Sequence, residues 1–336
     1  MNQKVLFIGG TGTISASCVS RALDSGWDVT LLNRGSRADS VPEGVKAITA
    51  DINDEDGVRA ALAGQNFDCV ADFIAFTPEQ VKRDIRLFNG AAGQYIFISS
   101  ASAYQKPASG WVVTESTPLA NQYWQYSRDK IACEDALMAE YRESGFPVTI
   151  VRPSHTYDHR SVPVSIHGSK GSWQVIARIL AGKPVLVHGD GLSLWTFTHA
   201  SDFAKAFAGL LGNVHAVGEA VHITSDEKIT WNQAYEAIGR ALGKKVDMLH
   251  VSSEMLAAFR PELTGNLLGD KANSVVFDNS KIKRLVPGFT ATVRFDQGVR
   301  DTLDHVLSHK EYQREDPEFD AWCEMIAEKY RAFVRP

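Results

Sequence analysis

A tyrosine and a lysine four residues apart, in the segment Tyr126-Ser-Arg-Asp-Lys130, are the residues of this chain best suited to proton transfer. On a helix one turn separates them, so both side chains lie on the same face. A nearby ammonium favours the phenolate, and we therefore expect Lys130 to lower the pKa of Tyr126 from about 10. Such a tyrosine exchanges protons with the oxygen of a sugar or an alcohol. Because the same spacing also fits a solvated helix face, the interpretation depends on other elements.

A glycine-rich turn near the N-terminus is one such element. The apolar residues 5–8 predict a buried parallel strand, and Gly9-Gly-Thr-Gly-Thr-Ile-Ser15 follows them, ahead of apolar residues at helical spacing. Strand, glycine turn and helix together predict a dinucleotide-binding unit, with the pyrophosphate on the helix N-terminus. Gly9 permits the tight turn, Gly12 lets the backbone approach a phosphate, and Ser15 replaces the usual third glycine.

The residues that follow the second predicted strand, 29–32, bear on the choice of cofactor. A carboxylate there would bind the ribose hydroxyls of NAD, whereas this chain has Asn33 and Arg34, with Arg37 close by. An asparagine still bonds a ribose hydroxyl, and an arginine accommodates a 2′-phosphate. The pattern favours NADP slightly over NAD, and a solvated loop with incidental arginines stays open as the alternative.

With Gly9-x-x-Gly12, Tyr126-x-x-x-Lys130 and Tyr95-Ile-Phe-Ile-Ser-Ser100-Ala-Ser-Ala-Tyr104, the chain resembles the extended short-chain dehydrogenases/reductases, of the NAD(P)-dependent epimerase/dehydratase type. This family acts mostly on nucleotide sugars, and the resemblance extends to about residue 289. It implies an α/β fold: a Rossmann-type doubly wound parallel sheet with a smaller, discontinuous C-terminal substrate domain. The dinucleotide-binding domain would comprise residues 1–152 plus about 195–223, and the substrate domain about 153–194 and 224–336.

The resemblance also implies roles for individual residues. Ser100 would hold the reacting oxygen beside Tyr126, and Lys130 would bind the nicotinamide ribose. Asp51 and Ile52 match a pair that brackets the adenine. Together with the glycine motif, the resemblance implies the following cofactor-binding residues: Gly9, Thr11, Gly12, Thr13, Ile14, Asn33, Arg34, Asp51, Ile52, Phe73, Lys130 and Pro153.

Four residues are expected at the substrate: Ser102, His155, Trp195 and Arg260. Ser102 and His155 occupy family positions that face the substrate. Trp195 stands where nucleotide-sugar enzymes usually have an arginine that pairs with the substrate diphosphate, and an indole stacks on a ring but neutralises no diphosphate. Arg260 could supply the missing charge, as could Lys170 or Arg160. Trp195 equally fits a plain core aromatic.

Composition agrees with a water-soluble enzyme. Net charge −5 and a pI near 6.1 predict no nucleic-acid partner. No apolar run reaches the roughly 20 residues of a membrane span, and no signal peptide is recognisable. The cysteines Cys18, Cys69, Cys133 and Cys323 are scattered singly, which predicts reduced thiols and no metal site in a cytoplasmic protein.

The residues therefore predict an NAD(P)-dependent epimerase or oxidoreductase that acts on a hydroxyl or keto group of a sugar or nucleotide sugar. Sugar dehydration is disfavoured, because Ala101 and Ser102 stand where that subgroup commonly has Asp-Glu. The alternative is a cofactor-binding regulatory or RNA-binding protein on the same fold. By analogy with the family we expect a homodimer, formed through helices that include the Tyr126 helix. A C-terminal helix, residues 318–333, is predicted without a functional role.

Overall fold

The computed structural model describes residues 2–35 and 41–334, so Arg37 lies outside the described residues. A parallel sheet of seven strands forms its centre, in the order β12-β7-β5-β4-β1-β2-β3. The predicted α/β fold with a doubly wound parallel sheet is confirmed. The strands are β1 (Lys4–Ile8), β2 (Asp28–Asn33), β3 (Lys46–Thr49), β4 (Cys69–Asp72), β5 (Tyr95–Ile98), β7 (Val148–Pro153) and β12 (Ala220–Ile223).

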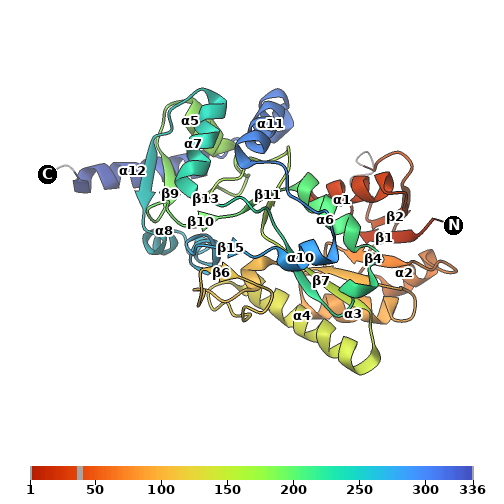
Figure 1. Cartoon of the computed structure of the whole chain (residues 1–336). Coiled ribbons are helices and arrows are strands. Elements are labelled where there is room, and N and C mark those ends of the chain that lie inside the picture. The colour runs from red at the N-terminus through yellow and green to blue at the C-terminus, as the bar shows by residue number, and fades with distance from the viewer. Residues whose placement is uncertain (1, 36–40, 335–336) are drawn as a thin grey trace.

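Helices cover both faces of this sheet, with α1 (Thr13–Asp24) and α6 (Ala200–Leu210) on one side, and α3 (Pro78–Phe88) and α4 (Gln125–Ser144) on the other (Figure 1). Successive side chains of a strand point to opposite faces. Val5 and Phe7 accordingly pack in one hydrophobic cluster, and Leu6 and Ile8 pack in another. Burial on both faces is the reason that β1 is a continuous apolar run rather than an alternating one.

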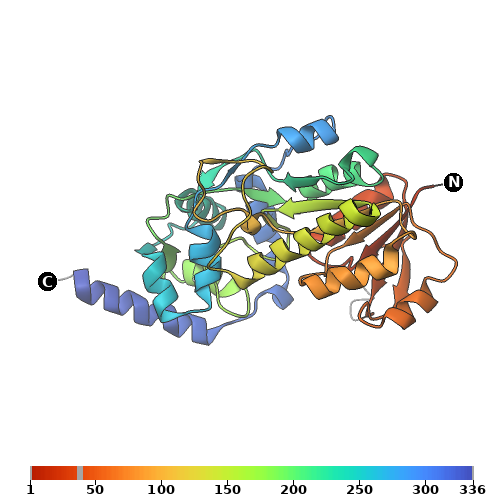
Figure 2. The same ribbon diagram turned by 90° about the horizontal axis from the view of Figure 1, so that it is seen from below.

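Two helices of the fold begin with a capping box. Thr77 caps α3, Pro78 occupies its first turn, and the side chain of Gln80 accepts the backbone N–H of Thr77 at 3.1 Å. Helix α7 (Trp231–Leu242) begins with the corresponding box at Thr230 and ends at Gly243, whose φ of 63° is left-handed. Beside α3, helix α4 lies along the sheet, and the short α2 (Glu55–Ala61) packs near the edge (Figure 2).

The other elements form four small two-stranded sheets and the remaining helices, around a separate cluster that contains Trp231. The sheets pair β8 (His155–Tyr157) with β11 (Phe197–His199), β9 (Val185–His188) with β14 (Met248–Val251), β10 (Leu194–Trp195) with β13 (Ile229–Thr230), and β6 (Val112–Val113) with β15 (Val276–Phe277). The helices are α5 (Trp173–Leu180), α8 (Ser253–Phe259), α9 (Leu263–Asn266), a π-helical turn (Leu267–Lys271), α10 (Ser280–Leu285), α11 (Phe295–Ser308) and α12 (Pro317–Val334).

The C-terminal helix α12 extends beyond the predicted bounds by one residue at each end. Its buried residues Phe319, Trp322 and Ile326 join the cluster around Trp231, so this helix packs on the body of the protein. The division into two domains stays a prediction. Ile282 and Phe289 pack in a hydrophobic cluster of the large sheet. Both residues lie in the segment 224–336, which the sequence assigned to the substrate domain.

All four cysteines are free and buried. Among the described residues, no group of three or more histidine, cysteine or acidic side chains could hold a metal ion. Across residues 2–35 and 41–334, no helix combines the length and the apolar character needed to cross a bilayer.

Candidate active site

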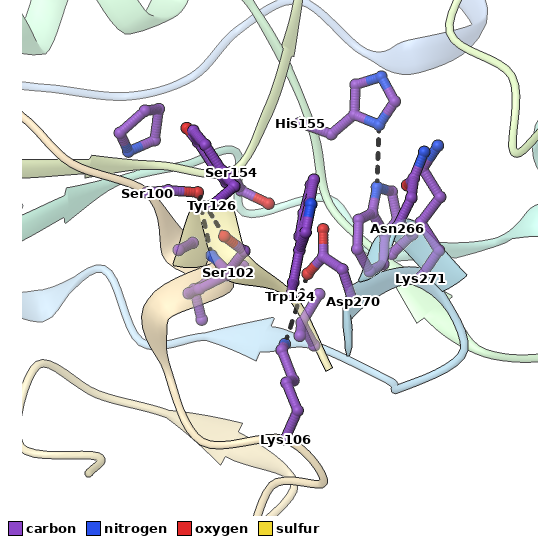
Figure 3. A pocket seen from close by; sticks show the side chains of 15 residues that line it. Ser100, Ser102, Lys106, Trp124, Tyr126, Ser154, His155, Asn266, Asp270 and Lys271 are labelled. Atoms are coloured by element: carbon purple, nitrogen blue, oxygen red, sulfur yellow. Dashed lines mark hydrogen bonds and ion pairs between the residues drawn. The ribbon is translucent and has the colours of Figure 1, made fainter. Parts of the chain in front are cut away.

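A cavity of about 290 Å³ opens at the carboxyl ends of β5 and β7, where open parallel sheets bind their ligands. Ser100 reaches it from the turn after β5, Pro153 from the end of β7, and Tyr126 from the first turn of α4 (Figure 3). The structure therefore brings together the serine and the tyrosine that the sequence paired as catalytic residues.

A chain of hydroxyl groups runs through this part of the cavity. The Ser100 and Ser102 oxygens are 2.9 Å apart, and Ser127 donates to Ser102 at 2.8 Å. The backbone N–H of Ser102 also donates to the Ser100 oxygen at 3.2 Å, because Ser100 caps the 3₁₀ turn Ala101–Ala103. The Ser100 hydroxyl also lies close enough to the Tyr126 phenol to lower its pKa. Ser100 is thus held in place beside Tyr126.

The expected lowering of the Tyr126 pKa by Lys130 is wrong for this structure. Burial raises the pKa of Tyr126, the nearby Ser100 hydroxyl counteracts this, and the negative charge of Asp270 raises the pKa further. The Lys130 ammonium lies 5.9 Å from the centre of the Tyr126 ring. Its positive charge is directed to backbone carbonyls rather than to the phenol.

Lys130 is buried between α4 and the sheet. Its ammonium donates to the carbonyls of Ala75 and Ile98, each at 2.7 Å, and lies 4.5 Å from the centre of the Phe76 ring. Burial lowers its pKa to about 8. Phe76 also lines the neighbouring groove, so Lys130 lies behind a wall of that groove.

A groove of about 550 Å³ follows the ends of β1, β2 and β4. Gly9 has a φ of 77°, and a Cβ added there would lie 2.5 Å from Cγ2 of Ile74. The residues at this turn therefore fit a cofactor that needs a close backbone approach. Eight of the predicted cofactor residues line the groove: Gly9, Thr11, Gly12, Asn33, Arg34, Asp51, Ile52 and Phe73.

The other predicted cofactor residues lie around the groove rather than in it. Pro153 lines the Tyr126 cavity, and Thr13 lines a smaller neighbouring cavity. Ile14 packs against the hydrophobic cluster of the sheet and is not among the residues that line the groove. Ser15, in the third glycine position, accepts the N–H of Gly12 at 2.8 Å.

Asn33 and Arg34 lie together at the groove end of β2. The Asn33 side chain accepts the N–H of Gly35 at 2.9 Å, while Arg34 is exposed. Among the described residues that line this groove, Asp51 is the one carboxylate, and it accepts the N–H of Asn53 at 3.0 Å. The groove therefore has a positive side chain, Arg34, directly after the second strand.

His155 and Trp195 are neighbours in the wall of the cavity. The indole N–H of Trp195 donates to Nδ1 of His155 at 3.2 Å. Burial, together with the charge of Lys271, lowers the pKa of His155 to about 3. His155 is therefore neutral and carries its proton on Nε2. Trp195 is also buried in the cluster around Trp231, so it packs in the core and lines the cavity at once.

Arg260 does not lie in the cavity. Its guanidinium stacks over Trp322 at 4.6 Å and pairs with Glu318 at 3.2 Å, so it holds α12. Arg160 is paired with Asp158 and donates to the carbonyl of Thr11 at 3.2 Å, beside the glycine turn. No arginine lines the cavity among the residues that the structure describes.

Sequence reasoning missed three charged residues that do line the cavity. Lys106 and Asp270 form an ion pair of 3.7 Å, and Lys271 donates to the carbonyl of Ser165 at 2.8 Å. Burial lowers the pKa of Lys271 to about 8. Lys106 stands two residues after Tyr104, and this closeness to the family motif was the one sequence signal that it lies near the active site. The Asp270-Lys271 pair has no recognisable motif around it.

Comparison with known proteins places this geometry in a family. The model of the NAD dependent epimerase/dehydratase family matches residues 5–224. A 2′-dehydrokanamycin reductase of Streptomyces kanamyceticus is 29% identical over 85% of this chain and 80% of the relative. The chloroplast stem-loop binding protein of 41 kDa b of Arabidopsis thaliana is 26% identical over 72% of this chain and 64% of that protein.

Solved structures agree on the fold. A dTDP-glucose 4,6-dehydratase of Bacillus anthracis, solved in complex with NAD, superposes with a TM-score of 0.73 at 19% identity, over 92% of this chain and 98% of the other. The family model covers both the glycine turn and the Tyr126 helix. The chain therefore belongs to the NAD dependent epimerase/dehydratase family.

Proposed function

We propose that the protein transfers hydride between NAD(P) and a carbon that carries a hydroxyl or keto group in a sugar-like substrate, with Tyr126 as the acid or base. One observation carries the proposal. Ser100 and Tyr126 line one cavity, and Lys130 of the same helix lies against Phe76, which lines the groove with the glycine turn. A reacting oxygen needs a proton donor or acceptor and a second hydrogen bond at the same place.

Each residue then has a distinct task. Ser100 orients the substrate oxygen, and Tyr126 gives or takes its proton. The bound cofactor supplies or accepts hydride at nicotinamide C4. Lys130 has three N–H donors, of which two bond the carbonyls of Ala75 and Ile98, and the remaining donor would bind the nicotinamide ribose. Neutral His155 and the hydroxyl of Ser102 would contact the substrate.

The raised pKa of Tyr126 fits best a phenol that gives its proton to a carbonyl oxygen during reduction. The name of the similar 2′-dehydrokanamycin reductase supports the same direction. An epimerase would instead keep its cofactor bound between two opposite hydride transfers. Retention of the cofactor distinguishes these two forms of the proposal.

Arg34 supports NADP as the preferred cofactor. A 2′-phosphate carries negative charge, and Arg34 is exposed at the end of β2, where NAD-specific sites place a carboxylate. The Bacillus anthracis dehydratase was solved with NAD, but it is only 19% identical to this chain. This similarity supports the shared fold and does not bear on the choice between NAD and NADP.

Replacing Tyr126 by phenylalanine tests the proposed role. Tyr126→Phe removes only the hydroxyl, so turnover should fall by about 100-fold or more while the cofactor still binds. Tyr123→Phe is the matched control, because Tyr123 is exposed three residues earlier and does not line the cavity. Full activity of Tyr126→Phe would refute the assignment.

A second candidate, RNA binding, is favoured by one observation, the similarity to a chloroplast stem-loop binding protein. The net charge of −5 opposes it, because phosphate contacts need clustered positive charge. RNA that binds at micromolar protein, and is released as salt increases, would establish this candidate.

The homodimer and the cytoplasmic location stay proposals by analogy, and light scattering of the purified protein tests the former.

A further inference from the structure

Lys106 and Asp270 face each other in the cavity without a direct hydrogen bond. Their ammonium and carboxylate are 3.7 Å apart, beyond the 2.7–3.2 Å of an ordinary N–H···O bond. Figure 3 shows Lys106 directed toward Asp270, which lies beside Trp124. Apart from this ion pair, no contact within hydrogen-bond distance reaches either charged group from the side chains or backbone that the structure describes.

Both groups are removed from bulk water. Lys106 is 5% exposed, and the side chain of Asp270 is 19% exposed. Burial lowers the pKa of Lys106 and raises the pKa of Asp270. Buried charged groups need hydrogen-bonding partners, and one long ion pair leaves most of their donors and acceptors unused. The unused donors of Lys106 and acceptors of Asp270 are therefore available to a ligand that enters the cavity.

The chemistry of the pair restricts what that can be. A hydroxyl group both donates and accepts, so it can accept from Lys106 and donate to Asp270 at once. A phosphate or carboxylate only accepts, and its charge would be repelled by Asp270. An ammonium only donates, and it would be repelled by Lys106.

Two further features of the same cavity agree with a neutral ring. The Trp124 ring lies 5.0 Å from the Tyr126 ring and lines the cavity, so it offers an apolar face beside the reacting groups. The other cation of the wall, Lys271, already donates to Ser165, and Trp195 donates to His155. No guanidinium is present among the described lining residues to bind a diphosphate.

We propose that Lys106 and Asp270 together hold a neutral hydroxyl group of the substrate next to the reacting carbon, so that the cavity takes an uncharged polyhydroxylated ring and not a nucleoside diphosphate sugar. Asp270 and Lys106 line the same cavity as Ser100 and Tyr126, so this hydroxyl and the reacting oxygen belong to one bound molecule. The inference rests on the proposed function, because Tyr126 defines the reacting carbon.

The first test compares neutral and anionic compounds as substrates of the wild-type protein. Methyl glycosides and cyclitols, at millimolar concentration with NADP or NAD, are set against UDP-glucose, and the absorbance of the reduced cofactor is followed. Oxidation of a neutral compound but not of UDP-glucose is the expected result. If UDP-glucose is oxidised, and Tyr126→Phe abolishes this oxidation, the proposed function stands and this inference is overturned. If none of the compounds reacts, this inference fails, whereas the proposed function is then judged by whether the protein binds or retains NADP or NAD.

The second test is the response of KM and kcat to changes in the pair. With the best neutral compound, Asp270→Asn and Lys106→Met should each raise KM by about 10- to 100-fold, the loss of a hydrogen bond to a charged group, and change kcat far less. Asp270→Asn should also raise the affinity for UDP relative to the neutral compound, because it removes a repelling charge. A purely structural role would not produce this change in selectivity.

Asp28→Asn and Lys46→Met are the matched controls. These residues form an ion pair of 2.7 Å at the first residues of β2 and β3, at the opposite end of the strands from the cavity. Their KM should equal that of the wild type, and cofactor affinity should be unchanged in all four variants. An unchanged KM in both cavity variants, or an equal loss in the controls, would overturn the assignment.

Discussion

Glu134 and Arg152 form a buried ion pair that joins helix α4 to strand β7 behind the active site. Nε of Arg152 donates to Oε1 of Glu134 at 2.9 Å, and a second guanidinium nitrogen bonds the other carboxylate oxygen. The hydroxyl of Ser99 donates to the same carboxylate. Glu134 lies one helical turn after Lys130, and Ser99 precedes Ser100. The pair therefore fixes the helix that carries Tyr126 against the turn that carries Ser100.

Glu134→Ala should destabilise the protein by about 3 to 5 kcal/mol, because it leaves the buried Arg152 without its partner. The free energy of unfolding in urea measures this loss. Glu55→Ala is the control, since it breaks an exposed ion pair with Arg86 and should cost far less. Equal losses in the two variants would show that the buried pair has no special structural role.

Neutral His155 should make stability depend on pH. Its pKa falls from 6.5 to about 3 on folding, so between these values the unfolded chain binds more protons. The contribution is complete above pH 6.5 and is lost as the pH falls toward 3, at up to about 1.4 kcal/mol per pH unit. His188, with a pKa lowered to about 4, adds to the same loss.

Unfolding measured from pH 7 down to pH 5 should therefore have a smaller slope in His155→Gln than in the wild type. His215→Gln, at an exposed histidine, is the control and should retain the wild-type slope. The assignment of a buried neutral imidazole would be wrong if His155→Gln had the same pH dependence as the control.

Arg34→Ala should weaken NADP binding by about 10-fold or more, because it removes a charge-assisted bond to the 2′-phosphate. NAD lacks this phosphate, so its affinity should hardly change. Fluorescence titration with NADPH and NADH measures both constants. Equal effects on the two nucleotides would contradict the preference for NADP.

Gly9→Ala should weaken cofactor binding and destabilise the fold by more than about 1 kcal/mol, because the backbone there is left-handed. Its added Cβ would also lie 2.5 Å from Ile74. Gly90→Ala separates the two effects, since Gly90 has a similar φ of 75° with nothing within 4 Å. The difference between the variants measures the clash in the cofactor turn, and similar behaviour of both would exclude it.

The elements with local signals could be predicted from sequence. The apolar run before Gly9, the capping box at Thr77 and the left-handed stop at Gly243 are each encoded within a few residues. The sheet follows from such elements, because parallel strands joined by helices have few possible arrangements. Ser100 and Tyr126 came together as expected, since each follows the end of a strand or begins a helix at the same edge of the sheet.

Contacts between distant segments could not be predicted in this way. Lys106 and Asp270 are separated by almost half of the chain, and nothing in either local sequence marks a buried charge. Arg260 was expected at the substrate from its type alone, and the direction of its side chain depends on packing against Trp322. The effect of Lys130 on Tyr126 was misjudged because the carbonyl partners of the ammonium belong to two other segments.

The nucleotide released on denaturing the freshly purified protein tests the central claim most directly. Mass spectrometry, with no cofactor added beforehand, should identify NADP or NAD, or else an empty protein that binds one of them on titration. A stoichiometric retained nucleotide would indicate an epimerase, and an empty protein that binds NADP would indicate a reductase that exchanges its cofactor. Neither nucleotide retained nor bound would contradict the account of the Gly9 groove and of the Tyr126 site beside it.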